Sequence, residues 1–357
     1  MKWKRILVAT DFSAPAGRAL ESARALAAEA GGTIVLLNVI SPPYSIYPQE
    51  MLDVGMLSES WIRETRRALA PLVARARRGG LKVRAEVRLG PPWRCILDVA
   101  EELAVNAIAI GASGHSRLDR LLLGSTAEKV VRRSPVPVLV THARALKRIG
   151  RVLAPVDLGE GSAWALDVVR HLGARAASIE ALLVVPREGA KAGPVVPYYP
   201  EAPPLPTMEE SDAALEQFLA LHALERAHPV VLAAEDVAGG ILEHERARRF
   251  DLLVIATHGR RGLDRALLGS VAEKVVRHAE SPVLVVPERQ GGRAVAALTA
   301  ETPRRGRREP ATLPERTRPR GRKGRGPWTG QAHTGRGGPA GRRGVGGPVP
   351  GKRKAED

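Results

Sequence analysis

The chain has a single cysteine and no long apolar run, and each shortage excludes a class of protein. Cys95 has no second cysteine to pair with, which excludes an internal disulfide and is typical of a reducing compartment. The first apolar run ends at Thr10 and Asp11, too early for a signal peptide, and no run approaches the length of a membrane span. We therefore expect a soluble, cytoplasmic protein with no membrane partner.

Two signatures of catalysis are also missing. The Gly-Lys-Ser/Thr phosphate loop is absent, so no lysine is placed to stabilise a leaving phosphate. No Ser–His–Asp or Cys–His grouping recurs along the chain. The sequence thus gives no catalytic residues and argues against an efficient enzyme.

What the chain does contain is one long stretch that occurs twice. Residues 107–140 and 252–285 align without a gap and share LLGS, AEKVVR and PVLV. Similarity over so long a stretch, aligned without a gap, indicates a duplication. The 357 residues therefore predict two domains, at 1–143 and 149–287, each large enough to bury its own core.

Both copies alternate apolar, β-branched runs with segments of helical spacing. Strands are expected at 5–9, 33–40, 82–89, 107–110 and 138–140, and again at 151–156, 178–185, 230–234, from 252 and at 283–286. Strand–helix–strand units are right-handed and build parallel sheets. The expected fold class is α/β, with two Rossmann-like domains, each a five-stranded parallel sheet flanked by helices.

A glycine-punctuated loop follows the strand at 107–110, with glycines at Gly111, Gly114 and Gly124. A glycine loop that leads from a strand to a helix N-terminus is the usual geometry for holding phosphate. Free N–H groups and the helix dipole then meet the anion, and the backbone can come close to it. The alternative is that these glycines only allow positive φ.

A helix is expected to begin at Ser125, because Glu128 lies three residues later and the pair matches a capping box. Ser270 and Glu273 repeat the pattern in the second copy. In the capping reading the serine hydroxyl only satisfies its own helix. In the binding reading it meets a phosphate.

The pattern Gly111-x2-Gly114-x9-Gly124-Ser125, followed by AEKVVR and PVPVLV, closely resembles the nucleotide-binding signature of universal stress proteins of the UspA type. The resemblance covers both halves of the chain. It implies a tandem member with an adenine nucleotide alpha hydrolase-like fold. It also implies that the loop holds the ribose and phosphates of ATP. Because the catalytic signatures are absent, hydrolysis is expected to be slow at most. A magnesium ion that bridges the phosphates is a further candidate.

The second copy departs from this signature at one position. Ala256 stands where the first glycine is expected, while the remaining signature residues are kept: Gly259, Gly269 and Ser270. An extra methyl group at a close backbone approach is expected to weaken binding in the second half. The first site is therefore the stronger candidate.

Asp11 and Asp157 each follow the first strand of their copy. Open α/β sheets bind ligands outside the carboxyl ends of their strands, where the strand order reverses. By resemblance, Asp11 and the backbone of Val39 lie near the adenine, and Val184 takes the place of Val39 in the second copy. The alternative for Asp11, compatible with the first, is an N-cap for the next helix.

Composition changes sharply after residue 287. Residues 288–357 carry 18 Lys or Arg and only 6 Asp or Glu, with almost no aliphatic residues. Such a segment cannot bury a core and is expected to be disordered. GRKGRG and AGRRG within it are similar to arginine–glycine segments that bind nucleic acid, although a charge run is more often only solvated.

Three functions remain open. The first is a tandem universal stress protein that binds ATP or a related adenine nucleotide and regulates a stress response. The second is a scaffold of the non-nucleotide branch, in which the fold serves as a dimerisation module. The third is nucleic-acid binding through the tail. In the first two, the resemblance implies that the copies pair internally through their last strands, joined by the linker at 143–150, with a homodimer as a further option.

Overall fold

The computed structural model describes residues 3–41, 54–113, 123–173, 176–187, 207–257 and 268–287. The predicted tail and two of the predicted site residues, Gly114 and Gly259, lie outside these ranges.

The described strands form one sheet in the order β3-β2-β1-β4-β5-β10-β9-β6-β7-β8. The first half supplies β1 (Arg5–Ala9), β2 (Thr33–Ile40), β3 (Lys82–Leu89), β4 (Ala107–Gly111) and β5 (Val138–Thr141). The second half supplies β6 (Arg151–Val156), β7 (Ser178–Pro186), β8 (His228–Ala234), β9 (Leu252–Ala256) and β10 (Val283–Val286). Within each half the neighbours are parallel, so the predicted α/β fold with a parallel sheet in each copy is confirmed.

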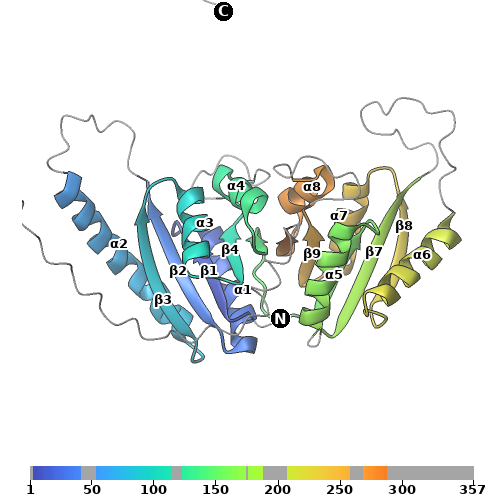
Figure 1. Cartoon of the computed structure of the whole chain (residues 1–357), viewed down its shortest axis with the longest axis horizontal. Helices are drawn as coiled ribbons and strands as arrows, with labels where there is room; N and C mark the ends of the chain where they lie inside the picture. The colour runs from blue at the N-terminus through green and yellow to red at the C-terminus, as the bar shows by residue number, and fades with distance from the viewer. Residues whose placement is uncertain are drawn as a thin grey trace, which may run out of the picture. The chain divides into compact units, whose positions relative to one another are not determined.

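Helices cover both faces of the sheet (Figure 1). One face carries α1 (Ala14–Ala30), α2 (Val54–Arg77), α5 (Glu160–Gly173) and α6 (Met208–Leu221). The other carries α3 (Pro92–Glu102), α4 (Ser125–Arg133), α7 (Val237–Arg248) and α8 (Ser270–His278). Buried aliphatic side chains from both faces of the central strands make two core layers, which explains the continuous apolar runs of these strands.

Local sequence signals set the ends of α1. The hydroxyl of Ser13 accepts a hydrogen bond from the N–H of Ala16 at 3.3 Å and so caps the helix. Pro15 lies in the first turn, where its missing N–H costs no helical hydrogen bond. Gly31 ends the helix in the left-handed conformation, with φ at 60°.

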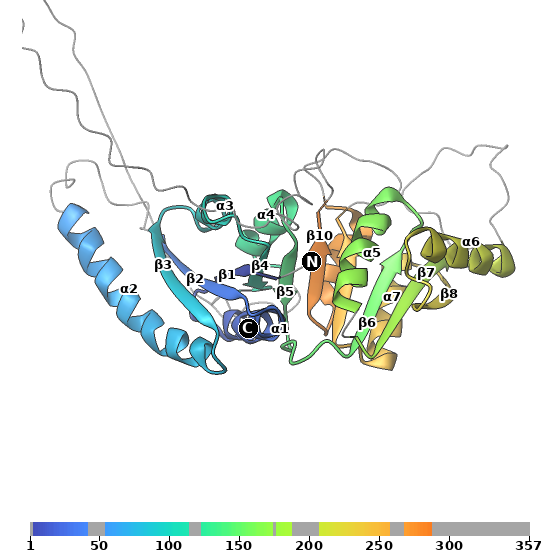
Figure 2. The same cartoon turned by 60° about the horizontal axis from the view of Figure 1, so that its bottom comes forward.

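The two halves meet where β5 and β10 pair antiparallel, with Leu139 opposite Leu284. Figure 2 shows the two strands side by side between the halves. This is the internal pairing through the last strands that the resemblance implies. Across the same junction, Nη2 of Arg132 lies 3.4 Å from Oε2 of Glu273.

A buried histidine also crosses the junction. Nε2 of His142 lies 2.5 Å from the carbonyl oxygen of Val276 in α8. Burial lowers the pKa of His142, and the positive charge of Arg18 adds to the effect, although the hydrogen bond to Val276 opposes it. The neutral ring is therefore the favoured form at this contact.

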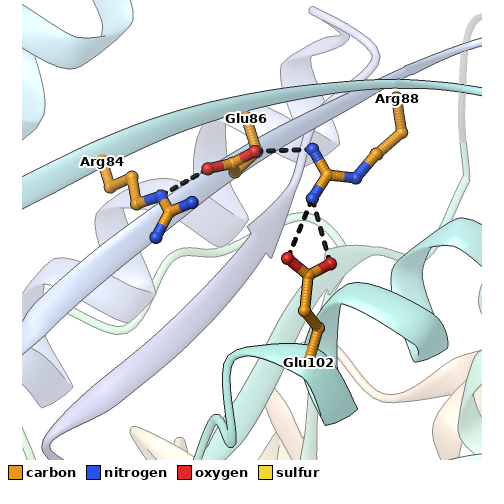
Figure 3. Close-up of polar contacts among 4 residues, drawn as sticks. All are labelled: Arg84, Glu86, Arg88 and Glu102. Atoms are coloured by element: carbon orange, nitrogen blue, oxygen red, sulfur yellow. Dashed lines mark hydrogen bonds and ion pairs between the residues drawn. The ribbon is translucent and has the colours of Figure 1, made fainter. Parts of the chain in front are cut away.

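The outer strand β3 carries charged side chains on one face. Figure 3 shows Glu86 between Arg84 and Arg88, with Arg88 reaching on to Glu102 of α3. The nitrogen–oxygen distances from Arg88 are 2.7 Å to Glu86 and 3.0 Å to Glu102. Charges on an edge strand oppose strand addition by another chain, so this edge is protected.

None of the helices in the described residues combines the length and apolar character that crossing a membrane would require.

Candidate functional site

A cavity of about 330 Å³ opens at the carboxyl ends of β1, β2 and β4 in the first half. Strand order reverses here, because β1 lies between β2 and β4. Open α/β sheets bind ligands at such a crevice. The volume falls within the range of small-molecule pockets, about 300–1,000 Å³. The cavity brings together five of the predicted site residues: Asp11, Val39, Gly111, Gly124 and Ser125.

The lining of the cavity divides into apolar and polar groups. The apolar side chains come from strands and from α3: Leu37, Val39, Pro92, Ile96 and Ile110. The hydroxyl side chains come from the strand ends and from α4: Thr10, Ser113, Ser125 and Thr126. An apolar surface facing a few polar groups suits a flat base joined to a polar chain.

The first turn of α4 supplies the polar end of the cavity. The capping box predicted there is wrong. Gly124 is the N-cap, and no side chain hydrogen-bonds to the start of the helix. Ser125 is the first helical residue, one position too late to cap, and Glu128 instead pairs with Arg132 at 3.0 Å. The same correction holds for Ser270 and Glu273, since Gly269 is the N-cap of α8.

The missing cap has a chemical consequence. Side chains cap α1, α6 and α7, and the residues that do so are Ser13, Thr207 and Asp236. At α4 the first backbone N–H groups have no such partner, and residues Gly124–Ala127 line the cavity. Uncapped N–H groups and the positive end of the helix dipole form an anion site.

Gly111 is needed for packing as well as for access to the cavity. A Cβ placed on it would lie 2.8 Å from the Cβ of Pro15 and 2.8 Å from the backbone nitrogen of Ala16. The first turn of α1 therefore rests directly on the end of β4. Neither sequence-based interpretation of this glycine, access for phosphate or positive φ, included this packing role, in which the missing side chain admits α1.

Asp11 lies in a tight turn at the end of β1, exposed and on the cavity lining. Its Oδ1 accepts a hydrogen bond from the N–H of Ser13 at 3.0 Å. Phe12 between them has φ at 67°, a conformation that is unusual for a bulky residue. Since Ser13 is the helix cap, the alternative N-cap role of Asp11 is wrong, and the turn instead fixes its carboxylate at the cavity.

The second half repeats the layout with different groups. Oδ1 of Asp157 accepts hydrogen bonds from the N–H of Gly159 at 3.0 Å and from the hydroxyl of Ser162 at 2.5 Å. In the first half the residue equivalent to Ser162 is Ala16, which has no hydroxyl. The second carboxylate is thus held by its own helix.

Other lining positions also become less polar in the second half. Val156 and Val271 stand where the first half has Thr10 and Thr126. Val184 is buried, with 7% of its surface exposed. Gly240 packs closely against it, since a Cβ built on Gly240 would lie 3.1 Å from a side-chain carbon of Val184. Ala256 adds a methyl group at the end of β9, where the first half has Gly111.

Sequence reasoning missed the contribution of α3 and of two threonines. Pro92 and Ile96 line the cavity from α3, because the helix after β3 begins beside the crevice. Pro92, the first residue of the helix, was a usable signal, since proline favours the first helical position. Thr10 and Thr126 were detectable as polar residues at a strand end and in the first turn of a helix.

Metal binding has no preassembled site in the described part of the chain. No group of three or more His, Cys, Asp or Glu residues there is arranged to hold a metal ion.

Comparison with known proteins gives a consistent result. The model of the universal stress protein family matches residues 2–142 and 148–287. A universal stress protein of Mycolicibacterium smegmatis is 28% identical over 297 residues, covering 80% of this chain and 97% of that protein. One of Methanocaldococcus jannaschii is 31% identical over 139 residues, covering 39% of this chain and 81% of that protein.

The fold is also similar to that of a solved structure. A universal stress protein from Archaeoglobus fulgidus DSM 4304 superposes with a TM-score of 0.59 at 19% identity. The match covers 80% of this chain and 97% of that one, so the likeness extends across both halves of the fold.

Proposed function

The chain belongs to the universal stress protein family, and from this premise we propose that it binds ATP or a related adenine nucleotide in the first-half cavity. Binding there would set a nucleotide-dependent state that acts in a stress response. The proposed setting is the cytoplasm, in keeping with the single cysteine. The observation that carries the proposal is the uncapped first turn of α4, which lines a cavity at the strand-order reversal.

The lining suggests how the nucleotide would lie. The base would rest against Leu37, Val39 and Ile96, where the cavity is apolar. The phosphates would meet the N–H groups at the start of α4 and the hydroxyls of Ser125 and Thr126. Asp11 is fixed at the same crevice, where a carboxylate can accept hydrogen bonds from the base or ribose.

We propose one nucleotide per chain. In the second half the hydroxyl of Ser162 binds Asp157, and the threonine hydroxyls of the first cavity are replaced by valines. A ligand would have to break the Ser162–Asp157 hydrogen bond, and it would find fewer polar partners. Both changes lower affinity.

The proposed role is binding rather than turnover. The described lining offers no lysine at the α4 turn and no histidine to act as a base. Hydrolysis, where it occurs, would be slow. Magnesium would enter with the nucleotide phosphates, because the described residues do not assemble a metal site of their own.

Isothermal titration calorimetry of ATP against the full chain tests the proposal, with Ser125→Ala and Ser270→Ala as matched variants. We expect one site per chain, weakened by Ser125→Ala and unchanged by Ser270→Ala. Absence of heat at millimolar ATP would favour the scaffold function instead. Equal weakening by both variants would contradict the single-site proposal.

A further inference from the structure

A cluster of cations surrounds one tryptophan on the face of the first half that carries α3 and α4. The side chain of Trp93 in α3 is half-buried. The charged groups of Arg133, Arg94 and Lys129 lie 4.7, 5.5 and 6.0 Å from its ring centroid. We call these four residues the Trp93 patch. Figure 1 shows that α3 and α4, which supply it, are neighbours on the sheet.

The three cations of the patch are exposed. None of them forms an ion pair or hydrogen bond through its side chain with another residue in the described ranges. Arg132, which precedes Arg133 in α4, behaves differently, because it pairs with both Glu128 and Glu273. Three positive charges are therefore gathered around Trp93, and none of them is paired with a carboxylate of the described residues.

The second half has no such patch, although its helices are equivalent. Ala238 and Gly239 replace Trp93 and Arg94, and His278 replaces Arg133. Lys274 is kept, but its Nζ lies 3.4 Å from Asp236, whose equivalent in the first half is Pro91. The fold itself therefore does not require the patch.

The patch lies beside the first-half cavity but is separate from it. Pro92 and Ile96 of α3 line the cavity, and Trp93 follows Pro92 in the chain. On α4, Ser125 lines the cavity, whereas Lys129 lies one turn further along the helix. None of the four patch residues is part of the cavity lining.

We propose that the Trp93 patch binds single-stranded nucleic acid. Arginine and lysine side chains would contact successive phosphates, and a base would stack on the indole ring in place of a cation. This pairing of an aromatic platform with a basic surface is how sequence-tolerant single-strand binding works. An acidic peptide would use the charges but would leave the indole without a stacking partner.

The test measures binding of an oligothymidylate of about 12 nucleotides by fluorescence anisotropy, using the full chain. Lys129→Glu has a matched control in Lys274→Glu, which makes the same charge change at the equivalent position of the second half. The basic tail is identical in all variants. Lys129→Glu should weaken binding and lower the salt-dependence slope by about 0.7, as loss of one phosphate contact on a single strand requires. Lys274→Glu should leave both unchanged.

Trp93→Leu tests the stacking step separately. It should weaken oligothymidylate binding about five-fold or more, the loss expected of one stacked base, and leave binding of inorganic polyphosphate unchanged. Photo-crosslinking of an iodouracil-containing oligonucleotide should label the peptide that carries Trp93. Equal loss with Lys129→Glu and Lys274→Glu, unchanged oligonucleotide binding by Trp93→Leu, or crosslinks confined to residues 288–357 would each overturn the proposal.

Discussion

The hydroxyl of Ser162 lies 2.5 Å from Oδ1 of Asp157, and the equivalent pair in the first half is Ala16 and Asp11. This hydroxyl group is one of the differences between the two crevices. In the second half the Ser162 hydroxyl hydrogen-bonds to the carboxylate of Asp157, whereas the equivalent Asp11 of the first half lies on the lining of a cavity.

Ala16→Ser should convert the first crevice toward the second. The added hydroxyl would hydrogen-bond to Asp11 and occupy space at Ala16, which lines the cavity. We expect ATP affinity to fall by about 1 kcal/mol, or roughly five-fold, which is the worth of one hydrogen bond that the ligand must replace. Calorimetry measures the change. Ser162→Ala is the control and should leave affinity for the first site as it is.

Gly111→Ala should destabilise the fold, because its Cβ would lie 2.8 Å from Pro15. Overpacking of this kind costs about 1–3 kcal/mol in the free energy of unfolding. In the second half, Ala256 takes the position of Gly111 and Gly161 takes that of Pro15, so the glycine lies in the helix and not in the strand. Adding Pro15→Gly should therefore recover part of the loss.

Urea denaturation of the two single variants and the double variant provides the measurement. A coupling energy of about 0.5–3 kcal/mol is expected for residues in contact. Strict additivity of the two single-variant changes in unfolding free energy would show that Pro15 and a methyl group added at Gly111 do not compete for the same space.

Much of the fold could be predicted from sequence because the central strands are buried on both faces. The runs at Arg5–Ala9, Thr33–Ile40 and Lys82–Leu89 were predicted with the bounds that the structure has. Helix starts were harder. The start of α4 at Ser125 was identified, but its cap, Gly124, was not.

The errors at the candidate site share a physical cause. A serine caps a helix only when its own φ and ψ are non-helical, but Ser125 already lies in the helix and Gly124 takes the cap position. The role of Gly111 depends on α1, which is nearly a hundred residues away in sequence and packs against it only in the folded chain. Neither feature is encoded in the local pattern.

The His142 contact predicts a pH dependence of stability. Burial lowers the pKa of this histidine in the folded state, so the unfolded state binds its proton more readily. The stability it contributes is complete above the unfolded pKa of about 6.5 and is lost as the pH falls toward the folded-state value. His142→Gln keeps an N–H donor for Val276 but does not titrate.

Thermal or urea unfolding of wild type and His142→Gln between pH 8 and pH 5 tests this, with His278→Gln as a control for a neighbouring histidine. The wild type should lose stability relative to His142→Gln on acidification, by at most about 1.4 kcal/mol per pH unit. Parallel pH profiles would contradict the assignment.

Glu273 is expected to matter for the junction between the halves. It accepts contacts from Arg132 at 3.4 Å and from Arg277 at 2.7 Å, and all three side chains are half-buried. Glu273→Ala should cost about 1 kcal/mol, the upper end for exposed pairs, because two arginines lose their shared partner. Glu280→Ala removes a more exposed pair, with Arg246 at 3.8 Å, and should cost little. Equal costs in urea denaturation would contradict this view of the junction.

The central claim is that the first-half cavity holds one adenine nucleotide, and equilibrium dialysis of the full chain against labelled ATP tests it most directly. The account predicts saturation at one ATP per chain, with roughly five-fold weaker retention in Ala16→Ser and unchanged retention in Ser270→Ala. Saturation at two per chain, or no retention at millimolar ATP, would contradict it.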